Sequence, residues 1–323
     1  SDMEGADLAN VLTTLRGRFG VCAETEVTIE GRVRGFTAEK AQTWVEAGAN
    51  RFSLGLQTSN TKLRRRLGRI ADRAEIAATL NALAETGAVV IVDLIYGLPG
   101  QTPPDLVEDI RFLAEETAID GLDLYALKVF PGSPLEKAVQ QNSLPPLPDA
   151  PTCAEIFLQA DAELARRGFE GFTPKHWRRS TRERSVYNKL AKETADILPF
   201  GSAGGGRIGE YALMQHPALE DYTKALDAGR KPALAMPSPR TPQSLFKGHL
   251  AAALNRCALP PHDQWGLPLA TAAQIAANWL EAGLIEARGN SANEPAFTLT
   301  PRGIFWHERL QASLLQGMAR RTG

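Results

Sequence analysis

Acidic, amide and guanidinium side chains recur where short apolar segments of this chain end. Glu30 closes EVTIE, Gln57 closes RFSLGLQ, and Asp93 interrupts VVIVDLIYG. Arg69 follows Gln57 by one short helical stretch, and Lys128 lies near the end of GLDLYALKVF. Carboxylates can receive an ammonium group or ribose hydroxyls, a guanidinium can bind a carboxylate, and an amide can do either. The set therefore suits a zwitterionic ligand that carries a ribose.

A lone carboxylate in an apolar segment also has a simpler interpretation. Asp93 could be a hydrogen-bonded structural group, because an unpaired charge in apolar surroundings costs free energy. Several polar groups at equivalent strand ends favour a ligand pocket instead, because chemistry collects at the carboxyl ends of parallel strands.

The segments that must position these groups alternate with helical sequence. Candidate strands cover residues 26–30, 51–57, 89–97 and 121–130, an order that favours parallel βα units. Thr37 is a suitable N-cap for a helix over 38–48, and Pro103 and Pro104 suit the start of a helix that runs to Glu116.

Four parallel strands are too few to close a barrel and would leave two open edges. The amphipathic stretch DLANVLTTLRGRFG precedes the first of them. We expect an α/β fold that is part of a larger barrel, about four βα units of it, with a preceding segment outside this chain.

The sequence changes character after Pro131, where proline and glycine become frequent. Helices are expected near 151–168, 241–257 and 270–283, followed by a short β-ribbon in GLIEARG and PAFTLTPRG. This pattern predicts a barrel domain over 1–135 and a mainly helical, winged-helix-like C-terminal domain over 136–323.

Composition excludes several classes of partner. The 323 residues carry 36 basic and 37 acidic side chains, a net charge of -1 that favours neither nucleic acid nor an anionic membrane. The sequence has no apolar run long enough to span a bilayer and no signal peptide at its start. We expect a cytoplasmic protein that binds no nucleic acid and no membrane.

The three cysteines, Cys22, Cys153 and Cys257, are too widely spaced for a zinc knuckle or a disulfide framework. The five histidines form no pair that one helix face could offer to a metal. We expect the three thiols to be reduced. We also expect that this chain alone builds no metal site.

Two motifs could indicate phosphate or nucleotide binding. The string KLRRRLGR is basic, but a solvated helix face is expected for Lys62, Arg64, Arg65 and Arg66. Gly204, Gly206 and Gly209 satisfy G-x-G-x-x-G, yet Pro199 occupies the place of the required strand. A tight glycine loop that approaches a ligand or packs on a sheet is the better interpretation.

Long stretches resemble the oxygen-independent coproporphyrinogen III oxidase family of radical S-adenosylmethionine enzymes. They are VTIEGRVRGF, AGANRFSLGLQTSN, LRRRLGRI, VDLIYGLPGQTPPDL, LDLYALKVFPGSPL and VYNKLAKETADILPFGSAGGGRIGEY. The segment PFGSAGGGRIGEYALMQ is most similar to the anaerobic haem-degrading methyltransferase branch, the HutW/ChuW type. The resemblance covers most of the chain.

The resemblance implies a partial (β/α)6 barrel with a C-terminal domain over the substrate. It assigns Glu30 to one S-adenosylmethionine, and Gln57, Arg69 and Asp93 to a second, with Lys128 near another cofactor contact. The family's C-x-x-x-C-x-x-C motif, which holds a [4Fe-4S] cluster, and its G-G-T-P stretch do not occur here. A segment outside this chain is the expected explanation, and a natural cluster-free relative is the alternative.

The branch resemblance implies a radical methyltransferase that methylates and opens haem without oxygen, served by a flavodoxin-type electron donor. Coproporphyrinogen III oxidation, a haem chaperone and an unrelated (β/α) barrel enzyme are the alternatives. Substrate contacts are expected from His176, Gln215 and His216. For either histidine the choice is between a haem ligand and a surface or hydrogen-bonded imidazole.

Overall fold

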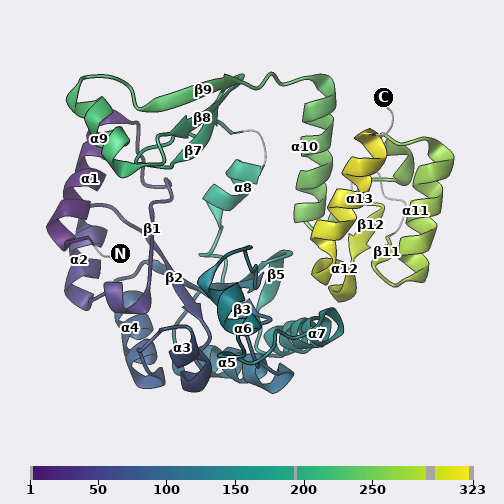
Figure 1. The fold of residues 1–323 in the computed structure, drawn as a ribbon, viewed down its shortest axis with the longest axis horizontal. Helices are drawn as coiled ribbons and strands as arrows, with labels where there is room; N and C mark the ends of the chain where they lie inside the picture. The colour runs from purple at the N-terminus through teal and green to yellow at the C-terminus, as the bar shows by residue number, and fades with distance from the viewer. Residues whose placement is uncertain (1–2, 193–194, 289–294, 320–323) are drawn as a thin grey trace. The chain divides into compact units, whose positions relative to one another are not determined.

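The computed structural model describes residues 3–192, 195–288 and 295–319, which form two compact units (Figure 1). Unit 1 comprises residues 1–184 and 300–306, and unit 2 comprises residues 185–299 and 307–323. The boundary expected at residue 135 falls inside unit 1. No helix in the described part of the chain combines the length and apolar character needed to cross a membrane.

Unit 1 is built on a six-stranded sheet in the order β1-β2-β3-β4-β6-β5. Its strands are β1 (Thr28–Gly31), β2 (Arg51–Gln57), β3 (Val89–Tyr96), β4 (Gly121–Ala126), β5 (Glu170–Thr173) and β6 (His176–Arg178). The first four are parallel, which confirms the expected βα units. The edge of β4 was expected to be open, and this was wrong: β6 pairs antiparallel with β4 and covers it.

The two faces of this sheet differ in polarity. Alternate residues such as Phe52, Leu54 and Val92 belong to one hydrophobic core. Because side chains alternate across a strand, their neighbours Arg51 and Asp93 lie on the opposite face. The sheet therefore presents an apolar face to the helices and a polar face to the inside of the half-barrel.

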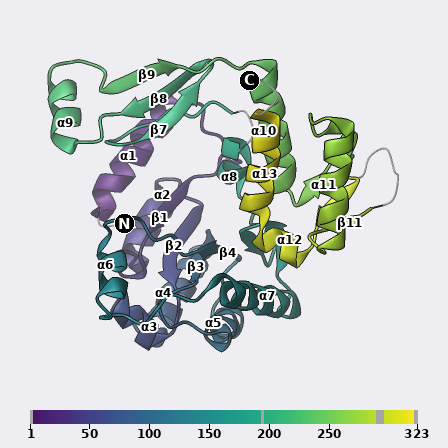
Figure 2. The same ribbon diagram turned by 45° about the vertical axis from the view of Figure 1, so that its right-hand side comes forward.

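Helices follow the strands of unit 1 and supply partners for the apolar face (Figure 2). They are α1 (Gly5–Arg18), α2 (Ala38–Glu46), α3 (Thr61–Arg66), α4 (Arg73–Glu85), α5 (Pro103–Glu116), α6 (Pro134–Gln140), α7 (Ala150–Arg166) and α12 (Pro301–Phe305). The expected cap of α2 is confirmed, because the Thr37 side chain accepts a hydrogen bond from Lys40 N. The proline start of α5 is confirmed as well.

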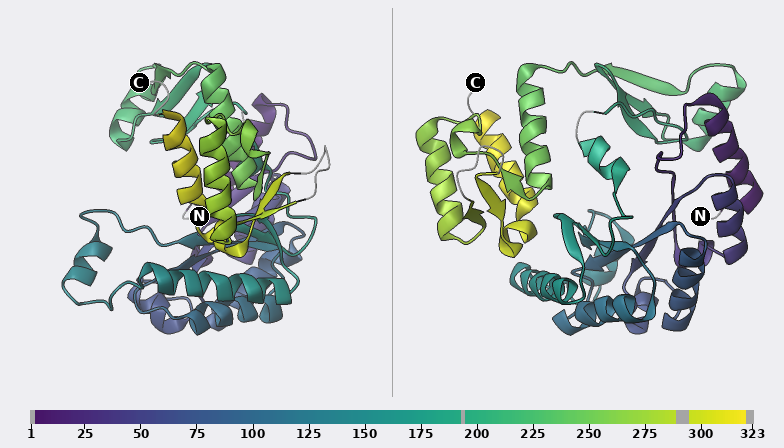
Figure 3. Two further views of the ribbon diagram at one scale, coloured as in Figure 1. Left: turned by 90° about the vertical axis from the view of Figure 1, so that its right-hand side faces the viewer. Right: turned by 180° about the vertical axis from the view of Figure 1, so that it is seen from behind.

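Two short helices of unit 1 have contrasting positions. α6 has no buried residue and projects away from the sheet (Figure 3). α12 brings Phe305 against the core, where its ring lies 6.1 Å from Tyr96 and 5.7 Å from Phe157. A segment distant in the sequence thus completes the packing of unit 1.

Unit 2 contains two three-stranded sheets and five helices among its described residues. The strands are β7 (Gly205–Ile208), β8 (Tyr211–Gln215), β9 (Ala233–Pro237), β10 (Ala258–Leu259), β11 (Ile285–Ala287) and β12 (Phe297–Leu299). The helices are α8 (Val186–Lys192), α9 (Leu219–Asp227), α10 (Pro242–Asn255), α11 (Leu269–Glu281) and α13 (His307–Ala319). Antiparallel pairing of β11 with β12 confirms the expected ribbon. The sheet β7-β8-β9 was not expected.

The glycine motif lies on β7 and its turn into β8, and no helix follows it. A Cβ on Gly206 would lie 2.2 Å from the Ile197 carbonyl oxygen, so only glycine allows this approach of two backbones. The glycines therefore serve close packing, as expected, but in a strand and its turn and not in a loop, and the strand–glycine turn–helix arrangement of a dinucleotide site is not formed here.

Substitution of Gly206 by alanine is expected to destabilise the β7-β8-β9 sheet by about 1–3 kcal/mol through this overlap. Hydrogen exchange of residues 205–215 measures the effect. Gly205→Ala is the matched control, because a Cβ there meets the Met214 side chain at ordinary distances, 3.7 Å to Cε and 4.0 Å to Sδ. Equal exchange in the two variants would contradict the packing role.

Candidate functional site

Three of the groups predicted from the sequence converge on Gly55, near the carboxyl end of β2. Asp93 is the register partner of Gly55 on β3. Arg69 Nη1 donates a 2.7 Å hydrogen bond to the Gly55 carbonyl oxygen. Gln57 folds back over the same glycine, since a Cβ on Gly55 would lie 3.1 Å from Gln57 Nε2. The absence of a side chain at residue 55 therefore leaves room for the polar groups around it.

Gln57 is held in an unusual conformation. Its φ is 68°, in the left-handed region that non-glycine residues rarely adopt, and the β2–β3 register breaks between Gly55 and Gln57. Its Oε1 atom is buried without a hydrogen-bond partner among the described residues. Such strain and an unsatisfied buried acceptor are typical of ligand sites.

Asp93 lies in anionic surroundings. Burial and the negative charges of Asp123 and Glu30 raise the pKa of Asp93 to about 7, although Arg51 and His176 act in the opposite direction. A carboxylate in this setting gains most from a ligand that brings a positive charge.

The remaining two predicted cofactor residues lie at the rim. Glu30 is the second-last residue of β1 and has an exposed side chain, and its charge acts on Asp93. Lys128 lies on the segment after β4, and its side chain is exposed. The structure thus groups Glu30 with Gln57, Arg69 and Asp93, and its described contacts do not add Lys128 to them.

A buried ion cluster continues the polar face below Asp93. Arg51 forms two hydrogen bonds to Glu183, at 2.9 Å and 3.2 Å. His176 Nδ1 lies 3.0 Å from Asp123 Oδ1. His176 Nε2 lies 3.3 Å from Glu183 Oε1, within ion-pair distance but not aligned for a hydrogen bond. All four residues are buried.

These contacts determine the charges of the cluster. Burial alone would lower the pKa of His176, but its contacts with Asp123 and Glu183 outweigh burial and raise that pKa to about 9. Burial alone would raise the pKa of Glu183, but His176 and Arg51 lower it to about 2. At neutral pH the cluster therefore contains an imidazolium between carboxylates.

Arg51, Asp123 and Glu183 were not predicted as site residues. The first two could have been recognised from the period-two placement of polar residues along β2 and β4. Glu183 lies 132 residues from Arg51, and no local pattern identifies it.

The three residues expected near the substrate lie in different units. His176 is in the sheet of unit 1, and both its ring nitrogens face carboxylates, which is the hydrogen-bonded alternative. Gln215 ends β8 in unit 2, and its Nε2 donates to the Pro199 carbonyl oxygen at 2.8 Å. His216 follows it with a half-buried side chain.

The basic string on α3 is only partly solvated. Lys62 and Arg65 are exposed, as expected, and Arg66 is half-buried. The expectation was wrong for Arg64, which is buried and donates to the carbonyl oxygens of Leu56, Thr58 and Ala71. These carbonyls lie at the end of β2, just after it and after α3, and the buried guanidinium satisfies them.

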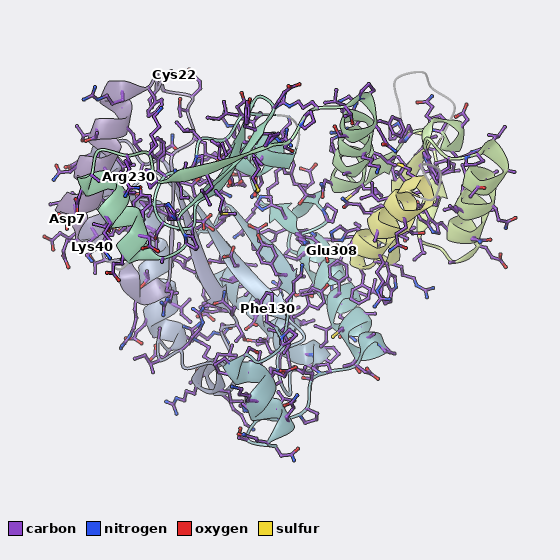
Figure 4. The ribbon with its side chains drawn as sticks, turned by 45° about the horizontal axis from the view of Figure 1, so that its top comes forward. Asp7, Cys22, Lys40, Phe130, Arg230 and Glu308 are labelled. Carbon is purple, nitrogen blue, oxygen red and sulfur yellow. The ribbon has the colours of Figure 1, made fainter. Side chains whose placement is uncertain are left out.

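The cysteines of the chain lie on separate segments of the two units. Cys22 lies in the exposed segment after α1 (Figure 4), and Cys153 lies on α7. Cys257 lies in unit 2. No group of three or more histidine, cysteine or acidic residues in the described ranges could hold a metal ion.

Comparisons with known proteins identify the family of this chain. Residues 6–113 match the model of the radical SAM superfamily. Anaerobilin synthase of Escherichia coli O157:H7 is 34% identical over 320 residues, which cover 97% of this chain and 69% of that protein. The heme chaperone HemW of Mycobacterium tuberculosis is 33% identical over 54% of this chain and 44% of its own length. The structure of coproporphyrinogen III oxidase (HemN) from Escherichia coli superimposes with a TM-score of 0.77, at 21% identity, over 97% of this chain and 74% of that one.

Proposed function

We propose that this chain, which belongs to the radical S-adenosylmethionine superfamily, forms part of an enzyme that methylates and opens haem under anaerobic conditions and so releases iron. The observation that carries the proposal is the 34% identity to anaerobilin synthase, which extends over 97% of the chain and includes unit 2. The match to the heme chaperone covers 54% of the chain. The proposed function therefore follows the relative that accounts for both units.

The site around Gly55 fits S-adenosylmethionine. Asp93 would receive its ammonium or ribose hydroxyl groups. Arg69 would bind its carboxylate, and the unpaired Gln57 Oε1 would accept one further hydrogen bond. Glu30, whose charge acts on Asp93, would contact the other S-adenosylmethionine of the two that the family resemblance implies. Lys128, at the rim, would assist in holding the cofactor. When bound, S-adenosylmethionine supplies the methyl group and the precursor of the radical.

The residues present do not fit a [4Fe-4S] cluster. Such a cluster needs thiolates grouped in space, and the three cysteines of this chain are not grouped. The role of the chain's own residues is to bind and orient S-adenosylmethionine and to hold the haem-derived substrate. A flavodoxin-type protein in the cytoplasm is the proposed electron donor.

The experiment is to incubate the cluster-reconstituted protein anaerobically with haem, a reductant and S-adenosylmethionine that carries a deuterated methyl group. We expect an open tetrapyrrole that contains the labelled methyl group, together with released iron, by mass spectrometry and a ferrous chelator. Unchanged haem in a stable complex would support a chaperone instead. Decarboxylation of coproporphyrinogen III in a parallel reaction would support the oxidase.

A further inference from the structure

The imidazole of His176 is fixed in the interior of the half-barrel by two carboxylates. Its side chain is 2% exposed, with Asp123 at 3.0 Å on one ring nitrogen and Glu183 at 3.3 Å on the other. Glu183 is held in turn by the two hydrogen bonds from Arg51. Because this imidazole is buried and both of its nitrogens face carboxylates, its effect on a ligand must pass through its neighbours.

The neighbour that connects this cluster to the ligand site is Asp123. Asp123 and Asp93 are register partners on β4 and β3, and their side chains share the polar face of the sheet. The negative charge of Asp123 opposes the ionisation of Asp93 and raises its pKa. A positive charge next to Asp123, on the side away from Asp93, offsets this repulsion.

Asp93 faces charged or titratable groups from every strand packed around it and from the loop after α3. They are Glu30 on β1, Arg51 on β2, Asp123 and Tyr125 on β4, His176 on β6 and Arg69 after α3. Among the cations, Arg51 already forms an ion pair with Glu183, and Arg69 donates a hydrogen bond to the Gly55 carbonyl oxygen. His176 is the cation in direct contact with Asp123.

We infer that His176 is a positioning residue for the S-adenosylmethionine site: its imidazolium neutralises Asp123, and Asp93 is thereby able to carry the negative charge that receives the cationic ligand. The inference rests on the proposed function, because it assigns the ligand of Asp93. It explains why a histidine that touches no ligand is enclosed by carboxylates at the base of the site.

The direct test follows the ionisation of Asp93 in the ligand-free chain by 13C NMR of the aspartate carboxyl groups, assigned with Asp93→Asn. In the wild type, Asp93 is expected to titrate with a pKa of about 7. In His176→Gln the midpoint should rise by about one pH unit or more, because the imidazolium no longer offsets Asp123. In His176→Gln/Asp123→Asn it should return to the wild-type value or lower, because the repelling carboxylate is also gone.

Equilibrium binding of S-adenosylmethionine from pH 6 to pH 9 gives the functional readout. His176→Gln should weaken binding about fivefold or more at pH 7, and the affinity should recover at pH 9. His307→Gln, which replaces a buried histidine in unit 2, is the control and should leave the pH profile unchanged.

A merely structural role for His176 would give a different result. Affinity would then fall equally at every pH, the Asp93 titration would not move, and the double variant would be weaker than the single one. Each of these outcomes overturns the inference. If the wild type itself fails to bind S-adenosylmethionine, the proposed function is contradicted, while the carboxyl titration still decides whether His176 controls Asp93.

Discussion

Replacement of Asp93 by asparagine is expected to weaken S-adenosylmethionine binding by roughly 10- to 100-fold at pH 8, because a charge-assisted contact is lost. It should also abolish the pH dependence. In the wild type, binding should strengthen as pH rises through about 7, the pKa at which burial and neighbouring carboxylates hold Asp93. Isothermal titration calorimetry from pH 6 to pH 9 measures both effects.

The same substitution should stabilise the fold at alkaline pH. The pKa of Asp93 in the folded chain is above its ordinary value of 3.8, so its contribution to stability is present below that value and is lost as pH rises through about 7. An asparagine carries no charge and avoids this loss. Weaker binding together with a higher unfolding midpoint at pH 8 would separate a ligand role from general damage to the fold.

Asp161→Asn provides the matched control. Asp161 lies on α7, and it accepts a hydrogen bond from Trp177 Nε1, whose ring packs in the core on the apolar face of the sheet. Burial raises the pKa of this carboxyl too. Its asparagine retains the acceptor oxygen, and S-adenosylmethionine affinity should not change. If Asp161→Asn and Asp93→Asn weakened binding equally, the assignment of Asp93 would be wrong.

Replacement of Glu183 by glutamine is expected to cost unit 1 about 3–5 kcal/mol of stability. The side chains of Glu183 and Arg51 are 0% and 6% exposed. The substitution removes the carboxylate closest to the buried Arg51 guanidinium, which among the described residues keeps only Glu26 at 4.0 Å, and leaves the His176 imidazolium with Asp123 alone. Hydrogen exchange of the amides in 51–57 and 89–96 measures unit 1 separately from unit 2.

The pH dependence of this stability has a defined sign. The pKa of Glu183 is lowered from 4.5 to about 2, so its stabilising effect is present above 4.5 and is lost as pH falls toward 2. The pKa of His176 is raised from 6.5 to about 9, so its effect is present below 6.5 and is lost as pH rises through 9. The cluster therefore stabilises unit 1 most between pH 4.5 and 6.5, and Glu183→Gln should flatten both slopes.

Glu163→Gln distinguishes a buried ion cluster from ion pairing in general. Glu163 contacts Arg111, Arg166 and Arg167, whose side chains are 45%, 65% and 30% exposed. These arginines remain hydrated when the carboxylate is removed, so the cost should be about 1 kcal/mol or less. A larger loss for Glu163→Gln than for Glu183→Gln would contradict the view that desolvation determines the effect.

Much of unit 1 could be predicted from the sequence because the signals are local. The apolar segments predicted β2 over 51–57, and the Thr37 cap and the prolines at 103 and 104 predicted the starts of α2 and α5. These signals act within a few residues of each other and need no knowledge of the rest of the chain. Parallel strands end at the same edge of a sheet. The predicted strands therefore also indicated that the side chains of Gln57, Arg69 and Asp93 would lie close together.

The buried charge cluster was decided by the tertiary structure alone. Asp123 and His176 are 53 residues apart, and Arg51 and Glu183 are 132 residues apart. Antiparallel pairing of β6 with β4 brings the histidine to the aspartate, and no periodicity in either segment specifies that pairing. The sequence by itself predicted that Glu30, Gln57, Arg69 and Asp93 would lie at one end of the sheet, although it also placed Lys128 there. Which of them carry charge depends on burial and on distant partners, and these exist only in the folded chain.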